Sequence, residues 1–198
     1  SAGVGDLWVH DLERSTKDRL TTTKDAQHPV WTPDGRHILL AAGMGSTTSS
    51  IWRIGSAAGS SPERVWGPVN AYPSSVTPDG STVLLTVFFP ETSRKDIAVL
   101  DALSPAEPRK LFPTSEERIW PRVAPDGAVL AYTSLETGTF EIYVHSYPSL
   151  GGKTRVSTGG GYRPTWSPDG RRLYYQWLNQ IMCVDVEGSN PPRVSAPR

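Results

Sequence analysis

Short apolar stretches alternate with clusters of Gly, Pro, Ser and Asp along the whole chain. Almost none of them has the 3.6-residue periodicity of an amphipathic helix, so the pattern favours β-strands. Two strand-like stretches flank a Pro-Asp-Gly triplet four times, as in "HPVWTPDGRHILL" from His28 and "YRPTWSPDGRRLYY" from Tyr162. The chain is therefore expected to be all-β and built from repeats.

The four triplets begin at prolines that lie 45, 47 and 43 residues apart. Pro has the φ angle of the second position of a type I turn, and Asp can accept a hydrogen bond from a nearby backbone N–H. Gly accepts the left-handed conformation that closes a three-residue hairpin with a bulge. The predicted turn residues are Pro33, Asp34, Gly35, Pro78, Asp79, Gly80, Pro125, Asp126, Gly127, Pro168, Asp169 and Gly170.

Two more strand-like segments follow each hairpin. The third strand is apolar on both faces, which predicts a sheet that is covered on both sides. Its second and third positions are Leu7–Trp8, Ile51–Trp52, Ile97–Ala98, Ile142–Tyr143 and Ile181–Met182. Four strands in each repeat match a blade of a β-propeller.

Residues 1–198 are thus predicted to form a single β-propeller region of four-stranded antiparallel blades, with about four and a half blades present. The expected limits are a half blade over 1–24 and blades over 25–69, 70–115, 116–160 and 161–198. Because the chain opens with the third and fourth strands of a blade, we expect a partial or open propeller. It is either a segment of a longer propeller or half of a ring that two copies close, with the open blade edge as a surface for homo-oligomerisation.

These repeats resemble the TolB-like propeller repeat, a bacterial relative of the WD repeat with the pattern P-x-W-S-P-D-G-x-x-L-x-Y. The stretch "RPTWSPDGRRLYYQ" is close to that pattern. The second repeat departs from it, because Val76 replaces the aromatic residue and one extra residue lies between Pro73 and Pro78. The insertion predicts a local β-bulge.

The segments "GDLWVHDLERSTKDRLTTTKDAQHPVWTPDGRHIL" and "FEIYVHSYPSLGGKTRVSTGGGYRPTWSPDGRRLYY" also resemble the propeller appended to many bacterial serine/threonine kinases. This resemblance implies a sensing or interaction module of a larger bacterial protein, across the membrane from the kinase. A periplasmic or extracytoplasmic location follows, with a cytoplasmic one as the alternative. The chain itself contains no kinase motif.

Composition narrows the range of partners. Twenty basic residues balance twenty acidic ones and are scattered, which argues against a nucleic-acid partner. No apolar run is long enough to span a bilayer, so no membrane insertion is expected. The chain has no Gly-x-Ser-x-Gly, no His-Glu-x-x-His and no acidic calcium loop, so no catalytic residue, metal or cofactor is predicted.

The four histidines are dispersed. His10 and His145 occupy a third-strand position that other repeats fill with Ile, Leu and Val, so we expect both to pack in the core or between blades. His37 follows a turn and is expected to be exposed.

One set of residues is a candidate binding site. It consists of the residue before the proline of each first strand: His28, Tyr72, Trp120 and Arg163. In a propeller this junction returns the chain to the central channel, so these side chains are expected to ring one mouth of it. Aromatic and arginine side chains are common anchors of binding sites. The alternative is that they only fill the mouth or cap the first strand.

Three functions remain open. The first is a non-enzymatic module that binds a protein, a peptide or another ligand. The second is the propeller of a carbohydrate-active lyase, or the accessory propeller of a prolyl-oligopeptidase-like enzyme. The third is a structural spacer or oligomerisation unit, and the fold alone does not decide among them.

Overall fold

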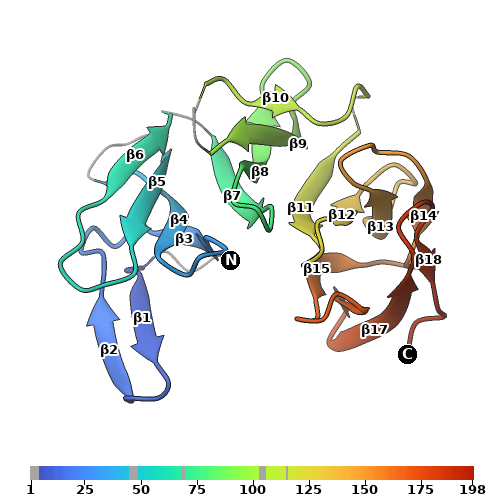
Figure 1. The fold of residues 1–198 in the computed structure, drawn as a ribbon. Helices are drawn as coiled ribbons and strands as arrows, with labels where there is room; N and C mark the ends of the chain where they lie inside the picture. Colours follow the sequence, from blue (N-terminus) through green and yellow to red (C-terminus); the bar gives the residue numbers. More distant parts are fainter. Residues whose placement is uncertain (1–4, 45–48, 68–69, 103–105, 115) are drawn as a thin grey trace. The chain divides into compact units, whose positions relative to one another are not determined.

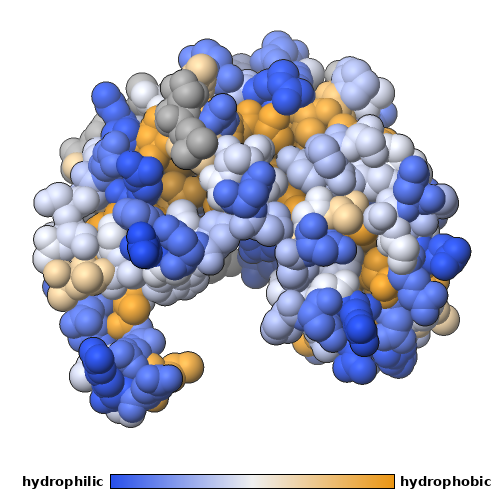
Figure 2. All heavy atoms as spheres, in the orientation of Figure 1, coloured by the Kyte–Doolittle hydropathy of each residue, from blue (hydrophilic) through white to orange (hydrophobic). Residues whose placement is uncertain are grey.

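A computed structural model describes residues 5–44, 49–67, 70–102, 106–114 and 116–198. These residues form antiparallel strands and turns, and they contain no helix, hence none that could cross a membrane (Figure 1). The face drawn in Figure 2 is covered mainly by hydrophilic side chains, with hydrophobic atoms visible between them.

The strands form one two-stranded sheet and four sheets of four strands. The two-stranded sheet contains β1 (Trp8–Asp11) and β2 (Thr16–Arg19). The next contains β3 (Gln27–Trp31), β4 (His37–Ala42), β5 (Ser50–Gly55) and β6 (Glu63–Trp66). It is followed by β7 (Ala71–Val76), β8 (Thr82–Phe89), β9 (Arg94–Asp101) and β10 (Arg109–Lys110).

The last two sheets have the same up-and-down order. One contains β11 (Arg118–Val123), β12 (Val129–Ser134), β13 (Glu141–Ser146) and β14 (Lys153–Arg155). The other contains β15 (Tyr162–Trp166), β16 (Arg172–Trp177), β17 (Gln180–Glu187) and β18 (Arg193–Val194). Neighbours in sequence are neighbours in every sheet, as expected for strands joined by short hairpins.

The chain separates into two compact units. Unit 1 contains Ser1–Val87 and Leu100–Pro108, and unit 2 contains Phe88–Val99 and Arg109–Arg198. In unit 1, side chains of β4 and β5 form a core with residues next to or in β1 and β2. Its buried members are Ile38, Leu40, Ala42 and Ile54, against which Leu7, Val9 and Leu20 pack.

Unit 2 has a larger core between two complete sheets. From the β11–β14 sheet it takes Val129, Ala131, Ile142, Val144 and Val156, and from the β15–β18 sheet Leu173, Tyr175 and Val184. These side chains belong mainly to the second and third strands, so the two sheets bury their flat sides against each other. Apolar area removed from water in this way is the main stabilising term in such a unit.

The Pro-Asp-Gly turns form as predicted. The N–H of Gly35 donates to Thr32 O at 2.9 Å, and the N–H of Gly170 donates to Ser167 O at 3.0 Å. The glycines have φ angles of 67°, 74°, 77° and 70° in chain order, in the left-handed region. The Asp carboxylates close the turns, because Asp34 accepts the N–H of Arg36 at 3.0 Å and Asp169 that of Arg171 at 3.1 Å.

The prediction that every third strand is covered on both sides is wrong at two of the five. Ile51, Ile97 and Ile142 are fully buried, but Trp8 is 54% exposed and Ile181 is 72% exposed. Within the described residues β1 and β17 belong to sheets that pack on one other sheet, and their second face meets solvent. The apolar pattern is the same in all five strands, so burial here depends on neighbouring sheets and not on local sequence.

Candidate functional site

The four candidate residues lie at the starts of the first strands β3, β7, β11 and β15 and form two pairs. In unit 1, the ring of His28 stacks on that of Tyr72 with centroids 4.1 Å apart and planes at 16°. In unit 2, the guanidinium of Arg163 lies 5.2 Å from the ring centroid of Trp120, a cation–π contact. Each pair joins equivalent positions of two consecutive repeats.

The backbone at three of these residues is strained. His28, Trp120 and Arg163 have φ angles of 50°, 54° and 52°, although none is glycine and each precedes a proline. A bulky residue in the left-handed region is an outlier, and a following proline normally drives a residue to extended angles. Such strain persists where surrounding structure imposes it, and it is concentrated at functional positions.

Each of the three strained residues lies within a β-bulge of its first strand. The register shifts between Gln27 and Val30, between Ile119 and Arg122, and between Tyr162 and Thr165. The bulge predicted in the second repeat lies between Pro73 and Ser75. Because the extra residue of that repeat places its bulge after the proline, Tyr72 keeps a regular pairing with Thr86. The bulges of the other three repeats were not predicted.

Aromatic side chains surround the Trp120–Arg163 pair. Tyr162 approaches the ring of Trp120 edge-on, with centroids 6.0 Å apart, and Phe140 lies 5.5 Å from Tyr162. An open cavity of about 340 Å³ is lined by Trp120, Tyr162, Arg163, Gln176 and Leu178. Tyr162 is 38% exposed and Leu178 is 73% exposed, so the cavity presents large apolar surfaces to solvent.

A buried carboxylate fixes the loop that leads into β15. Glu141 at the start of β13 has a side chain 1% exposed and accepts hydrogen bonds from the Nη2 of Arg155 and the N–H of Gly159, both at 2.8 Å. The N–H of Gly160 and the hydroxyl of Ser157 donate to it as well. Burial alone would raise the pKa of Glu141, but these hydrogen bonds hold it below its usual value.

Sequence reasoning missed this network, although the chain contains a second copy. Asp6, before β1, accepts hydrogen bonds from Arg19, from Thr21 and from the N–H of Lys24. The shared pattern is an acidic residue at or just before the start of the third strand, together with Arg-x-Ser or Arg-x-Thr that begins in the fourth. That pattern, compared between repeats, was the available signal.

A buried ion pair lies near the start of β11, two residues before Trp120. The side chain of Arg118 is 5% exposed and its Nη1 lies 3.3 Å from Asp96 Oδ1. Its Nη2 donates to Thr114 Oγ1 at 2.6 Å and to Glu116 Oε2 at 2.5 Å, and its guanidinium lies 4.5 Å from the ring of Phe112. Burial raises the pKa of Asp96 despite the arginine. The pair anchors the strand that carries Trp120.

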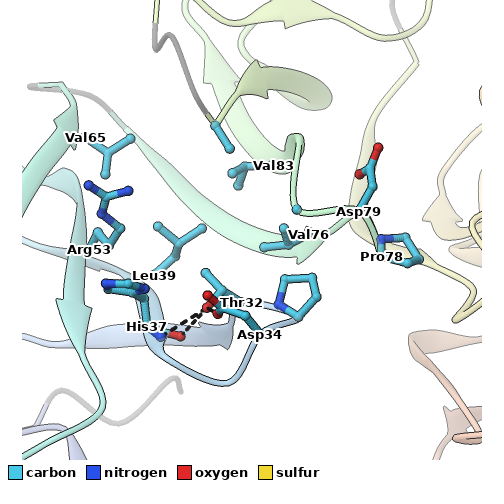
Figure 3. A pocket seen from close by; sticks show the side chains of 13 residues that line it. Thr32, Asp34, His37, Leu39, Arg53, Val65, Val76, Pro78, Asp79 and Val83 are labelled. Atoms are coloured by element: carbon cyan, nitrogen blue, oxygen red, sulfur yellow. Dashed lines mark hydrogen bonds between the residues drawn. The ribbon is translucent and has the colours of Figure 1, made fainter.

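A second cavity, of about 490 Å³, lies in unit 1 where the Pro-Asp-Gly turns of two repeats face each other (Figure 3). Its walls include Leu39, Val65, Val76 and Val83, with Arg53 at one side. The carboxylates of Asp34 and Asp79 at its rim are already hydrogen-bonded within their own turns. Hydroxyl groups of Thr32 and Thr77 donate to Asp34 and Asp79, and these bonds lower the pKa of both carboxyls.

The histidines and carboxylates are not gathered for metal binding. Within the described residues no group of three or more His, Cys, Asp or Glu side chains could hold a metal ion. His145 is half-buried and stacks with Tyr132 at 5.7 Å, which confirms its packing role. His10 is exposed, so the prediction that it packs in the core is wrong, and His37 is half-buried rather than exposed.

Comparisons with known proteins identify the fold. No family model matches the chain, and no curated protein matches it. The putative TolB from Agrobacterium tumefaciens superposes with a TM-score of 0.79 at 18% identity, over 97% of this chain and 73% of that one. TolB from Acinetobacter baumannii gives 0.75 at 21% identity, over 98% of this chain and 48% of that one.

A structure of the nidogen/laminin complex gives a TM-score of 0.71 at 15% identity, over 98% of this chain and 76% of that one. At such identities the likeness shows the fold alone. The sheets and these neighbours together confirm the predicted class: the chain is all-β and has the fold of TolB-like β-propellers, with four-stranded antiparallel blades. The resemblance to kinase-appended propellers is not among these findings and stays a prediction.

Proposed function

We propose that this chain is a non-enzymatic β-propeller module that binds a protein or peptide partner, as the sensing or interaction part of a larger bacterial protein. TolB-like propellers are in general protein-binding modules. The observation that carries the proposal is the Trp120–Arg163 pair, a strained aromatic and arginine contact beside an open cavity.

Several properties of this surface support a protein partner. Trp, Tyr and Arg are the residue types that most often carry the binding energy of protein interfaces. Here they occur together, with Tyr162 and the exposed Leu178 adding apolar area at the rim of the same cavity. The cation–π contact between Arg163 and Trp120 restricts both side chains before binding, which lowers the entropy lost on binding.

The stacked pair of His28 and Tyr72 is the equivalent feature of the two preceding repeats. We propose that His28 and Tyr72, like Trp120 and Arg163, contribute to partner binding, each at the start of a first strand. In the same proposal the five sheets are blades with limits at 1–24, 25–69, 70–115, 116–160 and 161–198.

The enzymatic alternatives have less support. A carbohydrate-active lyase of this fold would need clustered histidines around a metal, and in the described part of the chain the histidines are separate. An accessory propeller of a prolyl-oligopeptidase-like enzyme is compatible with the fold but has no feature of its own here. We propose a periplasmic or extracytoplasmic location, supported by the resemblance of the repeat to TolB.

Selection from a displayed library of random peptides tests the proposal. Peptides enriched on the wild-type protein should bind Trp120→Ala and Arg163→Ala about 30-fold more weakly, the loss typical of an interface hot spot. Trp31→Ala is the matched control, because Trp31 is 50% exposed on β3 and lies outside the candidate site. Circular dichroism must show that each variant is folded. Enriched peptides that bind all three variants as well as the wild type would contradict the proposal.

A further inference from the structure

Arg122 is a half-buried cation for which the described residues provide no counter-ion. It lies on β11 two residues after Trp120, and among the described residues its guanidinium has neither a hydrogen-bond nor an ion-pair partner. Its backbone pairs with Ala131 of β12, and its carbonyl also accepts the indole N–H of Trp166 at 3.0 Å. Burial lowers the pKa of Arg122, and no neighbouring charge opposes the effect.

The same strand shows how a buried arginine is normally accommodated. Arg118 is more deeply buried, and it has Asp96, Glu116 and Thr114 around its guanidinium. A guanidinium taken out of water without such partners loses hydration that nothing replaces. Arg122 therefore carries a cost that the folded chain alone does not offset. The equivalent positions in the first and last repeats hold the uncharged Val30 and Thr165.

Arg163 supplies a second cation on the adjacent first strand. It is exposed, its guanidinium rests on Trp120, and it forms no ion pair within the described residues. The bond from Trp166 to Arg122 O ties β15 to β11, so the two arginines lie on strands in direct contact. None of the five residues that line the neighbouring cavity is acidic. Among the described residues, the two arginines thus offer positive charge, and the cavity lining offers aromatic surface without a carboxylate.

We propose that Arg122 and Arg163 bind carboxylates of an acidic segment of the partner protein, whose apolar residues contact Trp120, Tyr162 and Leu178. The inference rests on the proposed protein-binding function and specifies the partner's chemistry. Arginine forms charge-assisted, often bidentate hydrogen bonds to carboxylates, and the half-buried position of Arg122 strengthens such a bond. A nucleic acid does not fit, because the chain has no net positive charge and its basic residues are scattered along the sequence.

The test uses the peptides selected on the wild-type protein, each resynthesised with its Asp and Glu replaced by Asn and Gln. The neutral versions should bind at least about tenfold more weakly, as expected for the loss of one charge-assisted hydrogen bond. Arg122→Gln and Arg163→Gln should each weaken binding of the acidic peptides by about the same factor. Arg171→Gln is the control, since Arg171 is exposed in the turn between β15 and β16 and should leave affinity unchanged.

The melting temperature provides a second readout, which does not depend on peptide binding. Arg122→Met keeps the length of the side chain and removes the unpaired charge, so its melting temperature should equal or exceed that of the wild type. A clear decrease would show that the folded chain itself satisfies Arg122, and would overturn the inference.

The outcomes separate the two proposals. Peptides that need Trp120 but bind equally without carboxylates, or equally to Arg122→Gln, would overturn the acidic-partner inference and leave the binding function standing. A phosphoserine replacement that raises affinity well above that of Asp would assign the site to phosphate and also overturn it. If no selected peptide depends on Trp120, both proposals fall.

Discussion

Removal of the Ser167 hydroxyl is the most direct test of the hydrogen bonds that stabilise the repeated turn. Three of the four Pro-Asp-Gly triplets follow a Thr or Ser, whereas the third follows Ala124. Ser167 donates to Asp169 Oδ1 at 2.6 Å and accepts the N–H of Arg172 at 2.9 Å. The substitution Ser167→Ala removes both bonds and changes little else, because Ala is the residue that the third repeat already accommodates.

The expected loss follows from the burial of the site. Ser167 is 9% exposed, so water does not fully replace the lost partner of the Arg172 N–H. The loss of one net hydrogen bond, together with one poorly solvated N–H, should lower the free energy of unfolding by about 1–2 kcal/mol. For a chain of this size that lowers the melting temperature by roughly 3–6 °C. The reverse substitution Ala124→Ser should gain about 0.5 kcal/mol, since Asp126 occupies the same position of its turn as Asp34 and Asp169.

Thermal unfolding followed by circular dichroism at several pH values is the assay. The Ser167 hydroxyl is the main cause, before the N–H of Arg171, of the lowered pKa of Asp169. A carboxyl with a lowered folded-state pKa stabilises the protein above its ordinary value of 3.8 and loses that contribution as the pH falls through the folded-state value. The difference between wild type and Ser167→Ala should therefore shrink on acidification below pH 4.

Ser61→Ala is the control, because Ser61 is exposed and makes no hydrogen bond among the described residues. A melting temperature of Ser167→Ala that matches this control at neutral pH would refute the reasoning. So would a difference that grows as the pH falls.

Three further predictions concern other parts of the fold. Gly35→Val should lower the free energy of unfolding by about 1–2 kcal/mol, because Gly35 has a φ angle of 67°. Gly35→Asn should lower it clearly less, and equal melting temperatures of the two variants would contradict this. Glu141→Gln should lower the free energy of unfolding in urea by about 2 kcal/mol, while the exposed Glu187→Gln should have almost no effect; similar losses would contradict a role for the buried network. His145 should titrate below 6.5 in NMR spectra because burial lowers its pKa. Its contribution to stability is full above 6.5 and is lost as the pH falls through the lower folded-state value, and a midpoint at or above 6.5 would be the opposite result.

The turns were predictable because each depends on a few adjacent residues. Pro33, Asp34 and Gly35 have backbone preferences that select one hairpin, and the four sheets follow once that hairpin recurs. Burial was less predictable. His10 and His145 occupy the same strand position, yet one is exposed and the other stacks on Tyr132. The difference depends on which sheets cover each strand, and a local pattern does not contain that information.

The sequence predicted which residues form the candidate site. It did not predict their backbone conformation or the role of Arg122. The residue before each first-strand proline could be identified from the repeat alone. Its left-handed backbone could not, since a following proline ordinarily favours extended angles. Arg122 was overlooked, although a charge at a position that holds Val30 and Thr165 elsewhere is visible in the sequence. What the structure adds is that this charge is half-buried and has no partner within the described residues.

Fluorine NMR of protein labelled with 5-fluorotryptophan tests the binding site most directly. The Trp120 resonance, assigned with Trp120→Phe, should shift when a selected peptide is titrated. The resonances of Trp8 and Trp31, which are 54% and 50% exposed and lie outside the site, should stay in place. A peptide that binds and moves Trp8 or Trp31 while leaving Trp120 unchanged would contradict the proposed binding surface.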